Sequence, residues 1–197
     1  MSAIRYQFRH ILMIIPLIIG AFNLTGCTVK SAEAFDKMVT FRDWDVYKTD
    51  VQYSIINSDL LVRDDHNPSM FPAIIADDNS YISFSVSFGD YSAGLRPLHM
   101  STLSDDIQPF REFLQWAKQP VEEREKTKEA LSNSPLFKTK NYRVANEMIT
   151  QQPLFITTRN SDFLTPKISM ALSEKDVANV ILTAYSVKVQ WDKGIKK

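Results

Sequence analysis

Hydrophobic and polar positions alternate most clearly over residues 81–88, where Ile, Phe, Val and Phe take turns with one tyrosine and three serines. A period of two places one set of side chains on each face of a β-strand, so this segment predicts a half-buried strand with one polar face. Shorter apolar runs between turn residues predict further strands. They lie at residues 51–55, 60–62, 73–75, 142–148, 154–158 and 167–172.

A helical insert is predicted between these two groups of strands, beginning near Ser104, a favourable N-cap residue. Apolar residues recur at helical spacing over residues 107–117, and Pro120 should end or bend this helix. Residues 122–129 are charged nearly throughout. We interpret them as a second helix that faces solvent.

The apolar residues near the end of the chain fit both the spacing of a helix and the spacing of a strand. Ser173 and Asp176 have the spacing of a capping box, and apolar residues keep helical spacing as far as Tyr185. From Tyr185 to Trp191, however, alternate residues are apolar, as they are in a strand. We expect a helix from about residue 174 that gives way to a strand near residue 186.

The N-terminal segment has a third pattern. Arg5 and Arg9 give a positively charged start, and a twelve-residue apolar stretch follows over residues 11–22. The tetrapeptide Leu-Thr-Gly-Cys then ends at Cys27, the only cysteine of the chain. This order of a basic start, an apolar run and small residues is that of a secretory signal peptide.

On these residues the chain resembles the bacterial lipoproteins, whose lipobox reads Leu, a small residue, Gly or Ala, then Cys. The resemblance covers residues 1–27 only. It implies transfer of a diacylglyceryl group to the sulfur of Cys27, cleavage before that residue and acylation of the new amino group. Two alternatives stay open: the uncharged residues 11–29 could cross a bilayer as an uncleaved helix of about 20 residues, or Cys27 could be an incidental core thiol.

The sequence therefore predicts three parts: a signal peptide over residues 1–26, a lipidated N-terminus and short linker over 27–34, and one globular domain over 35–197. The predicted fold class is α+β, an antiparallel β-sheet with one or two packed helices. The 23 basic and 23 acidic side chains leave no basic surplus, which argues against nucleic acid as a partner. With Cys27 the sole cysteine, no intramolecular disulfide can form.

Catalytic and cofactor motifs are not recognised in the sequence. The five glycines include no closely spaced set of three, as a dinucleotide fingerprint requires. Residues 90–94 come near to a nucleophile elbow around Ser92, but aspartate stands in place of the first glycine, so we interpret Ser92 as a loop serine. His66 and His99, the two histidines beyond the signal peptide, are too few for the usual structural zinc site. We expect no cofactor and no metal.

Aromatic and hydroxyl side chains offer two candidates for binding. Trp44, Trp116 and Trp191 could stack on sugar or peptidoglycan fragments, although packing is the commoner role of tryptophan. The polar face of residues 81–87, with Tyr81 and three serines, could form a binding face, and solvent is its ordinary partner.

We interpret the chain as a membrane-anchored bacterial envelope lipoprotein that acts as a non-enzymatic binding or assembly module. Its expected partners are the membrane, through the lipid on Cys27, and an envelope protein or polymer. Thr28 stands where lipoproteins retained in the inner membrane of enteric-type hosts have aspartate, which implies the outer membrane. Two alternatives remain: an envelope hydrolase with a dispersed site of Asp, Glu and His, and an inhibitor or exclusion lipoprotein.

Overall fold

The computed structural model describes residues 44–47, 49–57, 62–63, 68–88, 91–159 and 167–195. The predictions for the signal peptide, Cys27 and the linker concern residues outside these ranges, as does the prediction for His66. Of Trp44, only its place in a strand is described.

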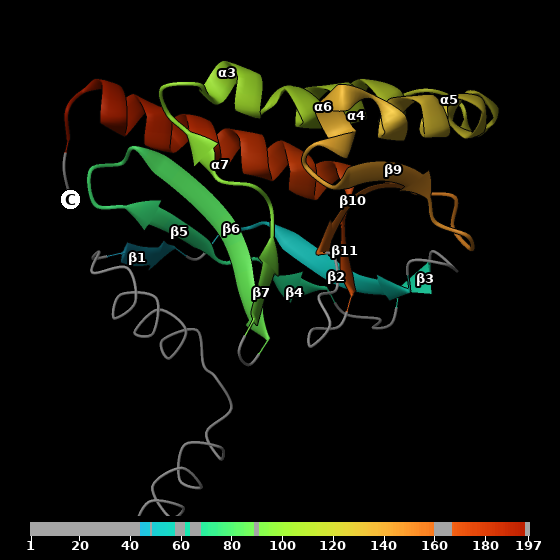
Figure 1. Cartoon of the computed structure of the whole chain (residues 1–197), viewed down its shortest axis with the longest axis horizontal. Coiled ribbons are helices and arrows are strands. Elements are labelled where there is room, and N and C mark those ends of the chain that lie inside the picture. The colour runs from blue at the N-terminus through green and yellow to red at the C-terminus, as the bar shows by residue number, and fades with distance from the viewer. Residues whose placement is uncertain are drawn as a thin grey trace, which may run out of the picture.

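The first of two antiparallel sheets has five strands in the order β1-β5-β6-β7, with β8 also pairing with β6 (Figure 1). The alternating segment forms its longest strand, and Ile82 and Phe84 on the apolar face are fully buried. The period-two prediction is therefore confirmed here. The strands are β1 (Trp44–Tyr47), β5 (Ala73–Ala76), β6 (Tyr81–Phe88), β7 (Tyr91–Gly94) and β8 (Leu98–His99).

The second sheet has six strands in the order β3-β2-β11-β10-β9, with β4 also pairing with β2. Here β2 pairs with β11, so that Ile55 lies opposite Met170. Residues 154–157 of β10 are buried on both faces, as expected of a strand in the middle of the molecule. The strands are β2 (Gln52–Asn57), β3 (Val62–Arg63), β4 (Ser69–Met70), β9 (Tyr142–Asn146), β10 (Pro153–Arg159) and β11 (Ile168–Leu172).

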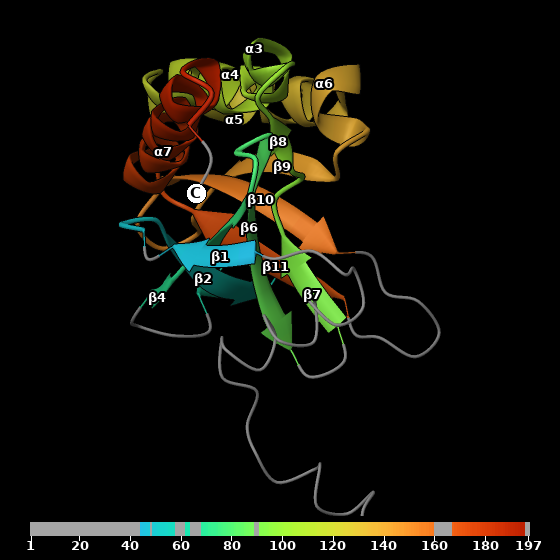
Figure 2. The same cartoon turned by 90° about the vertical axis from the view of Figure 1, so that its left-hand side faces the viewer.

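The helices gather over one end of the two sheets, as Figures 1 and 2 both show. They are α3 (Leu103–Asp106), α4 (Gln108–Ala117), α5 (Val121–Asn133), α6 (Pro135–Lys138) and α7 (Glu174–Asp192). The α+β class is confirmed. The described part has two sheets where one was expected, and three long helices and two short ones where one or two were expected.

The helical insert begins differently from the prediction. Thr102, not Ser104, is the N-cap residue, and Ser104 lies inside the single turn of α3. The main helix α4 starts afresh at Gln108 with Pro109 in its first turn. Proline has no N–H and is tolerated only in the first turn of a helix, so a new helix start is required there.

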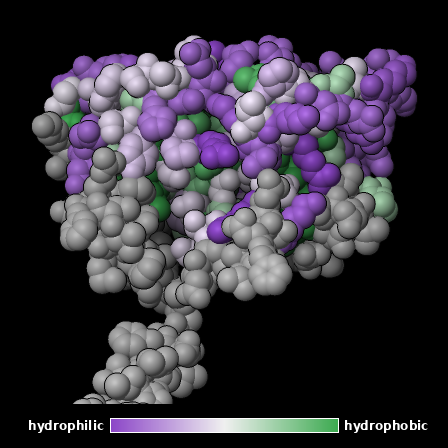
Figure 3. Space-filling model, in the orientation of Figure 1, coloured by the Kyte–Doolittle hydropathy of each residue, from purple (hydrophilic) through white to green (hydrophobic). Residues whose placement is uncertain are grey.

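The charged helix α5 lies on the surface, as predicted, with one exception. Arg124 is buried, and its guanidinium donates hydrogen bonds to the carbonyl oxygens of Ala117 at 3.3 Å and Gln151 at 2.8 Å. It also lies over the indole of Trp116, 5.7 Å from the ring centroid. One side chain thus joins α5 to the end of α4 and to the turn before β10. The rest of the helical layer is largely hydrophilic on the face seen in Figure 3.

The C-terminal segment is one continuous helix, and the predicted change to a strand near residue 186 is wrong. Val180, Ala184 and Val187 are buried at helical spacing and pack on the sheets. Tyr185 and Val189, which suggested a strand, lie on the opposite side of the helix and are 40% and 50% exposed. The alternation arose because apolar side chains occupy both faces of α7.

The core beneath the helices is an aromatic cluster around Phe155 of β10. Its ring centroid lies 4.8 Å from that of Tyr142, 5.0 Å from that of Phe110 and 5.5 Å from that of Phe113. The rings are tilted or edge-on, which is the favoured geometry of aromatic pairs. This packing holds α4 against β9 and β10, and so fixes one wall of the groove described next.

Candidate functional site

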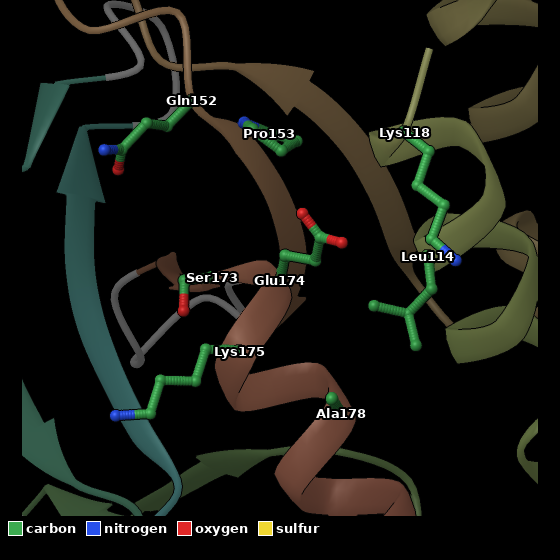
Figure 4. Close-up of a pocket in the computed structure, with 8 residues that line it drawn as sticks. All are labelled: Leu114, Lys118, Gln152, Pro153, Ser173, Glu174, Lys175 and Ala178. Atoms are coloured by element: carbon green, nitrogen blue, oxygen red, sulfur yellow. The ribbon is translucent and has the colours of Figure 1, made fainter.

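A groove of about 660 Å³ opens between α4, the start of α7 and the turn before β10 (Figure 4). Three separate stretches of the chain supply its walls. Figure 4 shows Leu114 and Lys118 on one side and the first turns of α7 on the other. The lining residues are Leu114, Lys118, Gln152, Pro153, Ser173, Glu174, Lys175 and Ala178.

A smaller hollow of about 140 Å³ adjoins this groove and shares Gln152, Ser173 and Lys175 with it. Its other walls come from β2 and from the first turn of α7. They are formed by Gln52, Tyr53, Ser54, Pro68 and Asp176. The two hollows together surround the N-terminal end of α7.

This end of α7 is held rigidly by its own sequence. The Ser173 hydroxyl accepts a hydrogen bond from the backbone N–H of Asp176 at 3.3 Å, and the Asp176 carboxylate accepts one from the N–H of Ser173 at 3.3 Å. This is the predicted capping box. The same carboxylate accepts a hydrogen bond from the N–H of Gln52 at 2.9 Å. The groove wall is therefore tied to β2 as well as to its own helix.

The groove combines apolar lining residues with charges of both signs. Leu114, Pro153 and Ala178 are its apolar residues, while the charges come from Lys118, Lys175 and Glu174. None of these three charged side chains has an ion pair or hydrogen bond with another residue in the described part of the chain. They are free to meet the charges of a ligand, and the positive end of the α7 dipole adds to the two lysines.

The candidate nucleophile and the described histidine both lie outside these hollows. Ser92 is exposed on β7, and its carbonyl oxygen accepts a hydrogen bond from the Arg159 guanidinium. His99 is exposed on β8, where its ring packs on that of Tyr81 with the centroids 5.7 Å apart. The structure does not bring Ser92 and His99 together through any hydrogen bond among the described residues.

Metal-binding geometry is likewise not formed in the ranges that the structure describes, where no three His, Cys, Asp or Glu side chains gather. Nor does any helix of those ranges have the length and apolar character to cross a membrane.

The aromatic candidates are packing residues where their side chains are described. Trp116 is 3% exposed, and its indole N–H lies 3.2 Å from the Thr127 hydroxyl, which accepts a hydrogen bond from it. Trp191 is half-buried against the core, with the Lys188 ammonium 4.7 Å from its ring centroid. The serines of β6 are half-buried and do not line either hollow.

The groove residues themselves were not predicted from the sequence. The one local signal was the capping box at Ser173, which marks the start of α7. Nothing in the sequence places Lys118 or Gln152 beside that start, because the three stretches are brought together only by the packing of α4 and the β9–β10 turn.

No protein-family model and no curated protein matches the chain. Among the solved structures that show a distant likeness are two of surface proteins of Borrelia burgdorferi. The complement regulator acquiring outer surface protein BbCRASP-4 or ErpC is 11% identical, with a TM-score of 0.33 over 71% of this chain and 98% of that chain. Complement regulator-acquiring surface protein 3 is 10% identical, with a TM-score of 0.29 over 68% of this chain and 93% of that chain. A likeness at this level carries neither a fold nor a function to this chain.

Proposed function

We propose that this chain is a lipid-anchored protein of the bacterial envelope, held in the outer membrane, that binds another envelope protein without catalysing a reaction. The observation that carries the binding function is the open groove between α4 and α7. It has apolar lining residues and three charged side chains without partners among the described residues. Ligand sites typically combine an apolar lining with a few convergent polar groups.

A short peptide segment fits this groove better than a polysaccharide chain does. The aromatic platforms on which sugars stack do not line it, because Trp116 is buried and Trp191 lies at the other end of α7. Lys118, Lys175 and Glu174 can pair with acidic and basic side chains, while Leu114 and Pro153 can pack on an apolar one. We therefore expect a partner segment that carries both charges around one apolar residue.

The anchor in this proposal rests on the lipobox that ends at Cys27. Attachment of the lipid forms a thioether, and this reaction needs a thiolate as the nucleophile. Cys27 has the only thiol in residues 1–27, so no other residue there could take the lipid. Several acyl chains would anchor the protein stably, since each buried methylene contributes about 0.8 kcal/mol. Thr28 supports the outer membrane in a host that sorts by the residue after the lipid site.

Photo-crosslinking in intact cells tests the binding function. A photoreactive amino acid replaces Gln152 or Lys175 at the groove, and the matched control carries it at Ala130, which is exposed on α5. We expect one envelope protein to be crosslinked from both groove positions and not from the control. Equal labelling from all three positions, or none from the groove, would remove the support for this site.

Mass spectrometry of the membrane-extracted protein tests the anchor separately. The expected mature chain begins at an acylated Cys27, and a Cys27→Ala variant should stay unprocessed. A wild-type chain that keeps its first 26 residues would show that the anchor assignment is wrong. That result would not bear on the binding function of the groove.

A further inference from the structure

Helix α7 carries apolar side chains on the side that faces away from the molecule. Leu182 is 65% exposed, Val189 50% and Tyr185 40%. With Ala178, which lines the groove, they form what we call the α7 stripe: Ala178, Leu182, Tyr185 and Val189. Single exposed apolar residues are normal on a protein surface, but here they follow one line along one helix.

The spacing of the α7 stripe is that of a coiled-coil seam. Its residues are separated by four, three and four positions, which is the a/d spacing of a heptad repeat. The buried residues Val180, Ala184 and Val187 lie on the opposite side of the helix. Figure 2 shows α7 at the edge of the helical layer, with its outer side clear of the other elements.

Tyr185 is held in place on this surface before any partner arrives. Its hydroxyl accepts a hydrogen bond from the Arg111 guanidinium of α4 at 2.5 Å. An aromatic side chain already fixed in one orientation loses little conformational entropy on binding. The stripe therefore has a preorganised ring at its centre, beside the exposed Leu182.

We propose that the α7 stripe is the contact surface for a second copy of this chain, with the two α7 helices packed antiparallel about a twofold axis. In that register Leu182 of one copy lies opposite Tyr185 of the other, and Ala178 lies opposite Val189. The small Ala178 leaves room for the larger valine. Each layer then pairs an a-type with a d-type position, as the antiparallel direction of the two helices requires.

The charges at the two ends of α7 select this partner and this direction. Glu174 and Lys175 stand at its start, and Asp192 and Lys193 at its end. In the antiparallel register Lys175 continues the seam and lies opposite Asp192, so that both symmetry-related end contacts join opposite charges. A parallel pair would place each charge against its own copy. Asp192 already pairs with Lys188 of its own helix, and the second lysine would share that carboxylate.

The size of the contact predicts a weak dimer. A helix of 19 residues is about 28 Å long at 1.5 Å per residue. Two such helices side by side bury about 1,000 Å², at the small end of specific interfaces. We expect a dissociation constant in the micromolar range. If both copies are anchored in one membrane, as the proposed function has it, their effective concentration rises and the dimer is favoured.

Zero-length carbodiimide crosslinking of the full-length chain in mild detergent tests this arrangement. The reagent couples a lysine to a carboxylate only where they touch. Lys175 and Asp192 of one helix are about 26 Å apart, so a crosslinked peptide that joins them can form only between two copies. We expect this peptide in the dimer band at micromolar protein concentration.

A substitution in the α7 stripe provides a second test of the proposed dimer. Leu182→Glu places a carboxylate of each copy near the twofold axis, opposite Tyr185 of the other copy, in place of the central apolar contact. Because Leu182 is mostly exposed the variant should fold, which circular dichroism checks. The matched control is Ala130→Glu, at an exposed position of α5. Leu182→Glu should reduce the 175–192 crosslink at least tenfold, and the control should leave it unchanged.

Three results would overturn the proposal: a monomer at all concentrations, a dimer that lacks the 175–192 crosslink, or a crosslink unaffected by Leu182→Glu. Capture of a different protein by the stripe in cells, without the dimer, also counts against it. The groove experiment remains interpretable through Gln152, which lies outside the α7 stripe and its end contacts, whereas a crosslink from position 175 to a second copy of the chain reports the dimer.

Discussion

The Asp176 carboxylate accepts a hydrogen bond from the backbone N–H of Gln52 at 2.9 Å, and so joins the first turn of α7 to β2 across 124 positions of sequence. The same carboxylate closes the capping box with Ser173. One side chain thus begins a helix and fastens it to a sheet.

Asp176→Ala should destabilise the domain by about 2–4 kcal/mol. The change removes the N3 half of the capping box and leaves the part-buried N–H of Gln52 without its charged acceptor. Glu174→Ala is the matched control, because this carboxylate lies exposed in the same turn and should cost less than about 1 kcal/mol. Urea denaturation measures both. Equal losses would show that the link to β2 contributes nothing of its own.

Arg124→Met should also destabilise the domain, by about 2–4 kcal/mol. Methionine keeps much of the apolar stem but leaves the carbonyl oxygens of Ala117 and Gln151 without their donor. Lys126→Met on the same helix is the control, since that lysine is exposed and paired only with Glu123. Thermal unfolding should show a clear fall in Tm for Arg124→Met and little change for Lys126→Met. A Tm near the wild-type value for Arg124→Met would contradict the role assigned to this contact.

The buried phenol of Tyr142 should make the free energy of unfolding depend on pH in the alkaline range. Burial raises the pKa of its phenol well above the ordinary value of about 10, an effect only partly opposed by the N–H of Arg96, which donates to the hydroxyl at 2.8 Å. The unfolded chain therefore loses this proton first as pH rises past about 10, so folded stability falls there, by up to about 1.4 kcal/mol per pH unit.

Tyr142→Phe isolates that effect. At pH 7 it should cost about 1 kcal/mol, because the N–H of Arg96 loses its acceptor. Between pH 10 and pH 11 the free energy of unfolding of the variant should fall less steeply than that of the wild type. The difference in slope should be up to about 1.4 kcal/mol per pH unit. Urea titrations at several pH values measure both quantities. Parallel pH curves for the two proteins would disprove the assignment to Tyr142.

Gly94→Ala should destabilise the β6–β7 pair by about 3 kcal/mol. An added Cβ would lie 2.1 Å from the carbonyl oxygen of Phe84, a backbone atom that cannot move aside without separating the strands. Gly194→Ala makes a useful comparison, because there nothing lies within 4 Å and the cost comes only from a φ of +64°. We expect about 1 kcal/mol at that position. A Gly94→Ala protein as stable as Gly194→Ala would refute the steric account.

The sequence predicted those elements whose two faces meet different surroundings. Strand β6 buries Ile82 and Phe84 and leaves its serines partly exposed, so its period of two was visible. Helix α7 buries Val180 and Val187 but also exposes Leu182 and Val189, so its period of 3.6 was obscured and its second half was mistaken for a strand. A helix with apolar residues on both sides loses the signal on which the prediction depends.

The candidate site could not be predicted by the same means. Lys118, Gln152 and Glu174 come from three separate stretches of the chain and share no motif. They meet because the aromatic cluster around Phe155 places α4 over β10, and that packing has no local pattern in the sequence. Ser92, which had a motif-like setting, lies exposed on β7 outside both hollows.

The pairing of β2 with β11 sets the order in which the domain can fold. Residues 52–57 pair with β3 and β4 close by in the sequence, but they meet β11 only when residues 168–172 have been made, so the six-stranded sheet stays open until then. Contacts between such distant segments form slowly, since a long loop must close first. The β2–β11 pairing is therefore a late step of folding, and the sheet closes around a strand that has waited for its neighbour.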